Sequence, residues 1–196
     1  MNKIMNQPES FVDESLKGIV LAHGDMLKFS EENTRAVVRS DAPVQDKVAI
    51  VTGGGYGHLP VFLGYVGRGL CDGVAVGNVF TSPSCDAIVA AAKATNSDAG
   101  VLFLFGNYMG DSMNFDMASE MLDMEDIPCA IVKAADDVAS APPEKWQERR
   151  GVAGLFFAYK AAGAKAAEGA SLAEVKAAAE KAVANIRSLG VALGAC

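Results

Sequence analysis

His58 is the side chain of this sequence best suited to acid–base chemistry, because an imidazole can exchange a proton near neutral pH. It directly follows the stretch Gly53-Gly-Gly-Tyr-Gly57, which has almost no side chains. Glycines in such a stretch allow a tight turn with positive φ, or a close approach of the backbone to a ligand. The sequence leaves two interpretations open: a tight connection between a strand and a helix, in which His58 only caps the loop, or a ligand-binding loop.

Asp111 is the second candidate for chemistry. It ends the stretch Gly106-Asn-Tyr-Met-Gly-Asp111, which follows an apolar run at 100–105. Asp111 could act as the N-cap of a helix expected at 112–124, or hydrogen-bond a ligand. A carboxylate near an imidazole fixes the imidazole's tautomer and raises its basicity. If the strands before His58 and Asp111 are parallel neighbours, both residues lie at the sheet edge where open α/β sheets bind their ligands.

The elements that would position these residues alternate along the chain. Apolar runs rich in β-branched or aromatic residues predict strands, and helical spacing or capping residues predict helices. Expected strands are 35–39, 48–52, 74–76, 100–105, 129–132 and 191–196; expected helices are 9–21, 82–94, 112–124, a long one that carries Trp146 and 149–154, and one from Ser171 to about Ser188. This pattern predicts an α/β fold with a central, largely parallel or mixed sheet flanked by helices on both faces, in a single domain over 1–196.

Local signals refine these helices. Ser82 is expected to cap the helix at 82–94, with Pro83 at its first position. Ser171 and Glu174 form a capping box. Asp136 and Asp137 follow the strand at 129–132, where they fit a helix cap or solvated turn better than a metal site.

Composition excludes several classes of function. The net charge is −7 and the chain has no basic run, so we expect neither nucleic acid nor membrane as a partner. No apolar stretch reaches the roughly 18 residues of a spanning helix, and no secretory segment opens the chain, which predicts a cytoplasmic protein. The four cysteines are widely spaced, which favours reduced thiols. Only two histidines are present, so no metal site is expected, and His23 is assigned to the end of the first helix.

A nucleotide-binding loop is a weaker interpretation of the glycine stretch. The Rossmann pattern G-x-G-x-x-G is only approximated by Gly53, Gly55 and then His58. No acidic residue follows at the distance where it would hold a ribose, and no Gly-Lys-Ser/Thr follows as in a P-loop.

Several motifs combine glycine with polar or aromatic residues; they are Gly53-Gly-Gly-Tyr-Gly-His58, Phe80-Thr-Ser-Pro83, Asn107-Tyr-Met-Gly-Asp111 with Asn114-Phe115, Arg149-Arg-Gly-Val-Ala-Gly154 and Ala192-Leu-Gly-Ala-Cys196. Together, and in this order over nearly the whole chain, they resemble the substrate-binding subunit of dihydroxyacetone (glycerone) kinases. The resemblance covers the amino-terminal half of that two-domain subunit. It implies an α/β domain, a homodimer, and phosphorylation of a terminal hydroxyl of dihydroxyacetone or a similar short ketose.

The resemblance also implies roles for individual residues. His58 would be the general base, Asp111 would hydrogen-bond the same end of the ketose, and the substrate-binding set would be Gly54, Gly55, Tyr56, Gly57, His58, Phe80, Gly106 and Asp111. No cofactor is expected on this chain, because the phosphate donor, ATP with magnesium or a phosphorylated carrier, would belong to a separate domain or subunit. The family's downstream histidine, which forms a hemiaminal with the ketose, has no counterpart here.

Three positions depart from the family's pattern. Tyr56 replaces a small serine, Leu59 replaces a glutamate, and Gly106 replaces a lysine that reaches the substrate. Loss of a cation and a gain of space at Gly106, with the phenol of Tyr56 nearby, would favour a longer ketose such as erythrulose. The same loss would suit an alternative function, a non-catalytic ketose-sensing relative that acts in transcription control. A nucleotide-binding domain is a further alternative.

Overall fold

A mixed six-stranded sheet forms the centre of the computed structural model, which describes residues 4–58 and 62–194. The strands, in the spatial order β1-β2-β4-β3-β5-β6, are Leu27–Phe29 (β1), Ala36–Arg39 (β2), Gly73–Gly77 (β4), Ala49–Gly55 (β3), Val101–Gly106 (β5) and Cys129–Ala134 (β6). The four strands β3 to β6 run parallel, and β1 and β2 add an antiparallel edge. The predicted α/β class with a mixed sheet is therefore confirmed.

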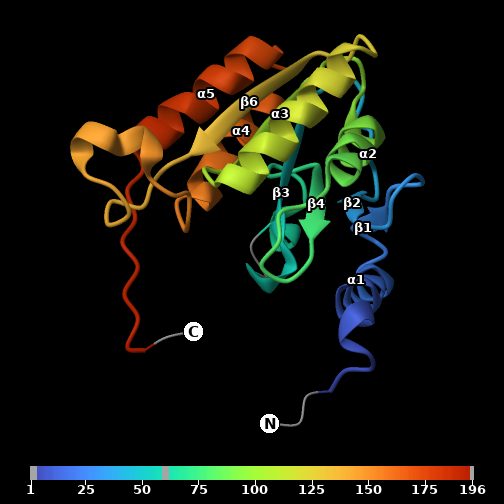
Figure 1. The fold of residues 1–196 in the computed structure, drawn as a ribbon. Coiled ribbons are helices and arrows are strands. Elements are labelled where there is room, and N and C mark those ends of the chain that lie inside the picture. Colours follow the sequence, from blue (N-terminus) through green and yellow to red (C-terminus); the bar gives the residue numbers. More distant parts are fainter. Residues whose placement is uncertain (1–3, 59–61, 195–196) are drawn as a thin grey trace.

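Helices cover both faces of this sheet (Figure 1). The helices are α1 (Phe11–Ala22), α2 (Cys85–Thr95), α3 (Met109–Asp123), α4 (Leu155–Ala167) and α5 (Leu172–Asn185), and 3-10 turns lie at Pro8–Ser10, Tyr56–His58, Leu63–Tyr65 and Pro143–Glu148. Helices α2 and α3 pack on one face, and α1, α4 and α5 pack on the other. None of these helices combines the length and hydrophobicity that crossing a membrane requires.

Successive side chains of each strand point to opposite faces of the sheet, which divides the core into two layers. Val51 and Phe103 point toward α2 and α3, whereas Ile50 and Leu102 point toward α4 and α5. All four side chains are fully buried, and each contributes roughly 1.5–3 kcal/mol through removal of apolar surface from water. Because both faces are covered, these strands read as continuous apolar runs, as buried parallel strands do.

The parallel arrangement brings four loops to one edge of the sheet. Residue pairs such as Gly55 with Gly77, and Gly106 with Ala134, lie side by side at the carboxyl ends of their strands. The loops that follow β3, β4, β5 and β6 therefore begin next to one another, and α3 starts directly from the short loop after β5.

Glycines 53–55 differ from the prediction of a bare loop after the strand, because they are the last residues of β3 and are buried. Positive φ does not explain them: among the described glycines it occurs at Gly69, Gly100 and Gly169. Close packing does. A Cβ atom on Gly53 would lie 2.9 Å from the carbonyl oxygen of Ala75, and one on Gly54 would lie 2.2 Å from the ring of Phe62.

Helix starts also differ from prediction. The N-cap of α2 is Ser84, whose hydroxyl accepts a hydrogen bond from the backbone N–H of Ala87, so the helix begins two residues later than expected and Ser82 does not cap it. Helix α3 starts at Met109 with Tyr108 as N-cap, which places Asp111 inside the first turn. The capping box of Ser171 and Glu174 is confirmed.

The chain around the last two helices was predicted least well. Residues 149–154 form no helix and connect the 3-10 turn Pro143–Glu148 to α4. The described part of the expected strand at 191–196 is not a strand either, because residues 191–194 extend from the body with exposed side chains. Just before them, Ser188 forms an isolated β-bridge with Asp137, which lies outside the sheet. The short strand β1 was not predicted. Residues 195 and 196 lie outside the described part.

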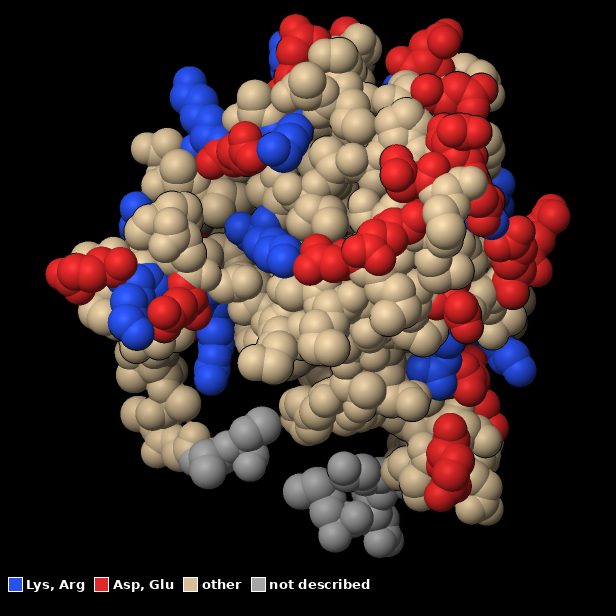
Figure 2. Space-filling model, turned by 45° about the horizontal axis from the view of Figure 1, so that its top comes forward, with Lys and Arg blue, Asp and Glu red and all other residues tan. Residues whose placement is uncertain are grey.

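Among the described residues, the surface carries no cluster of basic side chains on the face drawn in Figure 2. On the face drawn in Figure 2, lysine and arginine side chains are scattered singly or lie beside acidic ones, and the acidic side chains gather mainly toward the right. The absence of nucleic acid and membrane partners stays a prediction.

Two helical glycines allow a matched test of the packing. Gly163→Ala in α4 should destabilise the protein by about 1–3 kcal/mol, because the added Cβ would lie 2.3 Å from the carbonyl oxygen of Gly69. Gly18→Ala in α1 should stabilise it by roughly 0.5–1 kcal/mol, since nothing lies within 4 Å of the added atom and alanine favours a helix. Urea unfolding of both variants measures the two effects. Equal changes in the free energy of unfolding would contradict the packing of α4 on the loop at Gly69.

Candidate active site

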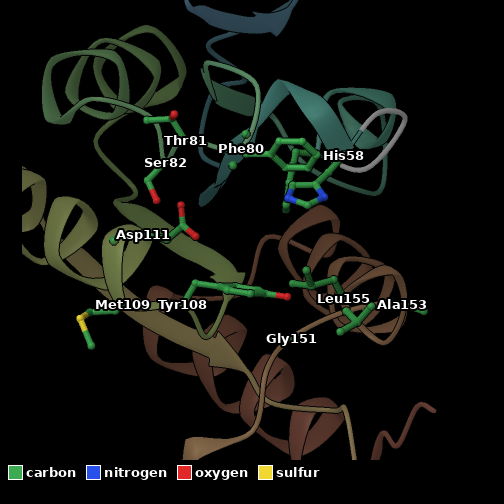
Figure 3. A pocket seen from close by; sticks show the side chains of 15 residues that line it. His58, Phe80, Thr81, Ser82, Tyr108, Met109, Asp111, Gly151, Ala153 and Leu155 are labelled. Carbon is green, nitrogen blue, oxygen red and sulfur yellow. The ribbon is translucent and has the colours of Figure 1, made fainter. Parts of the chain in front are cut away.

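A pocket of about 510 Å³ lies at the carboxyl ends of the parallel strands. Its walls come from four parts of the chain: the end of β3 with His58 and Phe62, the loop 80–82 after β4, the segment 108–111 at the start of α3, and residues 151–155 before and at the start of α4. The size is in the range of small-molecule sites. Figure 3 shows His58 and Asp111 on different sides of this space, with Tyr108 below them.

His58 is exposed and lies between two aromatic rings. Its ring centroid is 6.1 Å from that of Phe62 and 6.0 Å from that of Phe80, both in edge-to-face arrangements. The rings restrict the imidazole on its flanks, and Figure 3 shows it beside Phe80 with its nitrogens toward the pocket. A group that reaches the pocket can thus exchange a proton with it.

Asp111 is held in a less polar environment. Burial raises the pKa of its carboxyl group above the ordinary value, and the nearby Ser82 hydroxyl and His58 imidazole oppose this shift. Its Oδ1 atom is buried and has no hydrogen-bond partner among the described residues. Burial of a polar atom without a partner costs roughly 1–3 kcal/mol, so this oxygen is a strong candidate to accept a hydrogen bond from a ligand.

The loop after β4 brings Phe80, Thr81 and Ser82 into the pocket wall. Phe80 has a φ of 56°, a conformation that bulky residues adopt only when the surrounding structure imposes it. The loop folds back tightly over its own strand, because a Cβ atom on Gly77 would lie 1.9 Å from the carbonyl oxygen of Thr81. Asn114 of α3 donates a hydrogen bond of 2.7 Å to the carbonyl oxygen of Pro83 and so holds the end of the loop.

Tyr108 forms the floor of the pocket in Figure 3, where its hydroxyl group points toward Leu155. Burial raises the pKa of this phenol, and the charge of Arg150 only partly opposes the shift. The phenol is therefore protonated at neutral pH and can donate a hydrogen bond. Met109 also belongs to the wall, but its side chain points away from the space.

Gly106 does not line the pocket, although it lies just behind it. A Cβ atom there would lie 3.0 Å from the carbonyl oxygen of Gly151 and 3.2 Å from the ring of Tyr108. The expected gain of space at Gly106 is therefore wrong: the backbone of Gly151 and the ring of Tyr108 fill that space. The position still carries no cation.

Of the other predicted residues, Gly54, Gly55 and Phe80 line the pocket with His58 and Asp111, whereas Tyr56 and Gly57 do not. The Tyr56 ring packs edge-to-face on Phe11 of α1, 5.6 Å away, because the 3-10 turn directs it to that face of the sheet. Leu59 lies outside the described residues. His23 follows the end of α1, as predicted, and faces a different pocket.

Ser82, Tyr108 and residues 151–155 belong to the site but were not predicted to line it. Ser82 and Tyr108 lie in motifs that the sequence already marked, so their closeness to Phe80 and Asp111 was the available signal. Residues 151–154 also lie in a marked motif, Arg149–Gly154, but were expected within a helix. Within the described ranges, no three or more His, Cys, Asp or Glu side chains gather as a metal site would require.

Asp111→Asn should raise the free energy of unfolding at pH 7 by roughly 1 kcal/mol, because it removes a buried charge with an unpartnered oxygen. The folded-state pKa of Asp111 lies above the unfolded value, so its ionisation lowers stability above the folded pKa. This loss disappears as the pH falls toward the ordinary value of 3.8. The gain from the variant should thus shrink between pH 7 and about pH 4, measured by urea unfolding.

Asp116→Asn is the matched control, because Asp116 lies on the same helix but is exposed and pairs only weakly with Lys133 at 3.4 Å. Its effect should stay within about 0.5 kcal/mol at either pH. A stability loss in Asp111→Asn at pH 7 would show that the carboxylate is well solvated or paired, against the assignment.

Known proteins resemble this chain over nearly its full length. Over 196 residues the chain is 46% identical to L-erythrulose kinase of Pectobacterium atrosepticum, covering 100% of this chain and 33% of that protein. It is 45% identical over 193 residues to the dihydroxyacetone-binding subunit of a PTS-dependent dihydroxyacetone kinase of Listeria innocua, covering 98% of this chain and 58% of that one. The chain therefore spans only part of the length of these relatives.

Solved structures share the fold. The crystal structure of the dihydroxyacetone kinase of C. freundii superposes with a TM-score of 0.86 at 34% identity, over 94% of this chain and 34% of that one. A dihydroxyacetone kinase operon co-activator superposes with a TM-score of 0.76 at 30% identity, over 86% of this chain and 51% of that one. The Dak1 domain matches residues 17–196, which include every segment that lines the pocket, and the chain therefore belongs to the Dak1 domain family.

Proposed function

We propose that this chain is the ketose-binding part of a kinase that phosphorylates a terminal hydroxyl of a short ketose, dihydroxyacetone or erythrulose. One observation carries the proposal: His58 and Asp111 face the same pocket, and the buried Oδ1 atom of Asp111 has no partner among the described residues. A polyhydroxy ketone supplies hydroxyl donors of the kind that this oxygen lacks.

In this proposal His58 acts as the general base. A neutral alcohol is a weak nucleophile, and a base within hydrogen-bonding reach helps it to attack. The hydroxyl oxygen of the ketose forms a bond to the phosphorus atom of the donor's terminal phosphoryl group, the bond between that phosphorus and the donor breaks, and the hydroxyl proton passes to the imidazole of His58. The remaining catalysis of phosphoryl transfer is positioning and stabilisation of charge.

Asp111 and Tyr108 would orient the ketose. Asp111 accepts a hydrogen bond from a ketose hydroxyl through Oδ1, and burial raises its pKa, so this hydrogen bond also offsets the unfavourable burial of its charge. The protonated phenol of Tyr108, at the floor of the pocket, can donate to a ketose oxygen. Ser82 lies beside Asp111 and would limit the ways in which the carboxylate can turn.

Parts of the reaction would come from outside the described residues. We propose that the phosphate donor, ATP with magnesium or a phosphorylated carrier, is held by a separate domain or subunit, and that the covalent histidine of the family lies in the length of the relatives that this chain does not span. This makes the chain equivalent to the amino-terminal half of a two-domain kinase subunit. A homodimer and a cytoplasmic location belong to the same proposal.

Gly106 bears on which ketose is bound. A lysine is absent at this position, and the phenol of Tyr108 occupies the adjacent space. A neutral donor in place of a cation would suit the additional hydroxyl group of a four-carbon ketose, so we propose a preference for erythrulose over dihydroxyacetone. The relatives support both substrates, because a protein named for each is 45% or 46% identical to this chain.

A second candidate function is ketose sensing without turnover. The similarity to a dihydroxyacetone kinase operon co-activator supports it, as does the missing lysine at Gly106. The two functions differ in one measurable respect: a sensor binds the ketose, but a complete protein supplied with its donor does not phosphorylate it.

The test is a phosphorylation assay of the full-length protein with its donor domain or subunit on dihydroxyacetone and D- and L-erythrulose. His58→Ala should lower kcat by about 100-fold or more, because it removes the general base. His23→Ala is the matched control; it removes the other histidine, which lies at the end of α1 and faces a different pocket, and should leave kcat unchanged.

Full activity in His58→Ala would show that the base is another group. Phosphorylation of erythrulose no faster than of dihydroxyacetone would contradict the proposed preference. Ketose binding without any phosphorylation would favour the sensing function.

A further inference from the structure

The segment 149–154 has no regular secondary structure, and its residues 151–153 form one wall of the pocket. Gly151, Val152 and Ala153 line the space directly, and Figure 3 shows Gly151 and Ala153 opposite the loop that carries Phe80. Backbone of this kind keeps one shape only if hydrogen bonds from elsewhere hold it.

Asp136, two residues after β6, supplies the main anchor. Its carboxylate is 1% exposed. Oδ1 accepts a hydrogen bond of 3.0 Å from the backbone N–H of Val152, and Oδ2 accepts one of 2.9 Å from that of Gly154. The two oxygens thus bracket the part of the wall that faces the pocket. Asp136 forms no ion pair with any lysine or arginine of the described chain.

Gly154 is required for this contact. A Cβ atom at this position would lie 2.5 Å from Cγ of Asp136, so any other residue would push the carboxylate away from the wall. Neighbouring hydrogen bonds strengthen the anchor. The N–H of Asp137 donates to the carbonyl oxygen of Arg150 at 3.0 Å. The side-chain amide of Asn107 donates to the carbonyl oxygen of Arg149 at 2.9 Å.

The same aspartate also holds the segment after α5. The hydroxyl of Ser188 donates to Oδ2 of Asp136 at 2.5 Å, and the N–H of Ser188 donates to the carbonyl oxygen of Asp136 at 2.8 Å. Val138 closes the bridge, because its N–H donates to the carbonyl oxygen of Ser188 at 3.0 Å. One buried side chain therefore connects the pocket wall to the extended segment that begins at residue 186.

A cap of α4 alone would account for the bond to Gly154, which is the N-cap residue of that helix. It does not account for the bonds to Val152 and Ser188, which lie outside the helix. We infer that Asp136 is a positioning residue for ketose binding: it holds the wall at 151–153 in the shape that the ketose requires and couples this wall to the segment at 186–188. This inference rests on the proposed function.

The test compares wild type with Asp136→Asn in the full-length protein. Asparagine keeps the size, but its amide NH₂ would face an N–H or hydroxyl donor, so at least one of the bonds to the wall or to Ser188 is lost. The affinity for erythrulose or dihydroxyacetone should fall about tenfold or more, because small misplacements of a binding wall have large effects. The pH dependence of kcat should stay unchanged, since His58 and Asp111 are intact.

Asp72→Asn is the matched control. Asp72 is an equally buried carboxylate, 2% exposed, that accepts a hydrogen bond from the N–H of Ile50 and pairs with Arg39 and Lys47. It precedes β4 and so lies at the opposite end of the strands from the pocket. This variant should lose stability while the folded protein keeps its ketose affinity.

Two readouts separate positioning from general stability. Amide hydrogen exchange at 151–154 should become faster in Asp136→Asn than in Asp72→Asn, and the fluorescence of Trp146, the single tryptophan of the chain, should change only in the former. Should Asp136→Asn fail to fold, Ser188→Ala takes its place. Ser188 is half-buried and donates one of the hydrogen bonds to Asp136. Loss of this bond should weaken ketose binding about threefold and make amide exchange at 151–154 faster.

The outcomes are distinct. If wild type binds no ketose, the proposed function fails whatever the variants do. If wild type binds ketose and the Asp136 variant, or Ser188→Ala in its place, keeps both the affinity and the slow exchange at 151–154, the inference about Asp136 is overturned.

Discussion

Close backbone contact where the parallel strands end is the constraint on which the pocket depends. A Cβ atom on Gly77 would lie 1.9 Å from the carbonyl oxygen of Thr81, and one on Gly151 would lie 2.4 Å from that of Ala134. No larger residue fits at either position without displacement of backbone. Because these contacts are so short, the loops cross directly over the strand ends and bring residues from four parts of the chain into one small space. Packing of helices against the sheet tolerates more variation where it depends on apolar volume, and less at close contacts such as that of Gly163 with the carbonyl oxygen of Gly69.

Two carboxylates at this edge of the sheet differ in how far their oxygen atoms are hydrogen-bonded within the chain. Asp136 is buried with hydrogen bonds from Val152, Gly154 and Ser188, so its charge is well compensated and it stabilises the fold. Asp111 is partly buried, yet its Oδ1 atom has no partner among the described residues and its pKa is raised. A fold selected for stability alone would give hydrogen-bond partners to the buried oxygen atoms of both carboxylates. Local departures from that rule are expected at functional sites, and Asp111 is such a departure.

The sequence predicted the fold class and most strands because buried parallel strands are continuous apolar runs, as at β5. It missed β1, because three residues with Lys28 at the centre give no periodic signal. It placed the end of β3 too early, since glycine weakens a strand on its own and only the contacts of Gly53 and Gly54 with other parts of the chain explain why they belong to it. It chose Ser82 rather than Ser84 as a cap, a decision that only the hydrogen bond to Ala87 settles.

The site followed from connectivity more than from motifs. His58 and Asp111 come after neighbouring parallel strands, so their meeting at one edge was predictable. The wall at 151–155 was not, because it depends on hydrogen bonds between residues far apart in sequence. His58 is also exposed, and water would compete with a ketose hydroxyl for its imidazole. Phosphoryl transfer benefits from exclusion of water, so under the proposed function this chain supplies the binding and the base, and the activity depends on how far the bound ketose displaces water from His58.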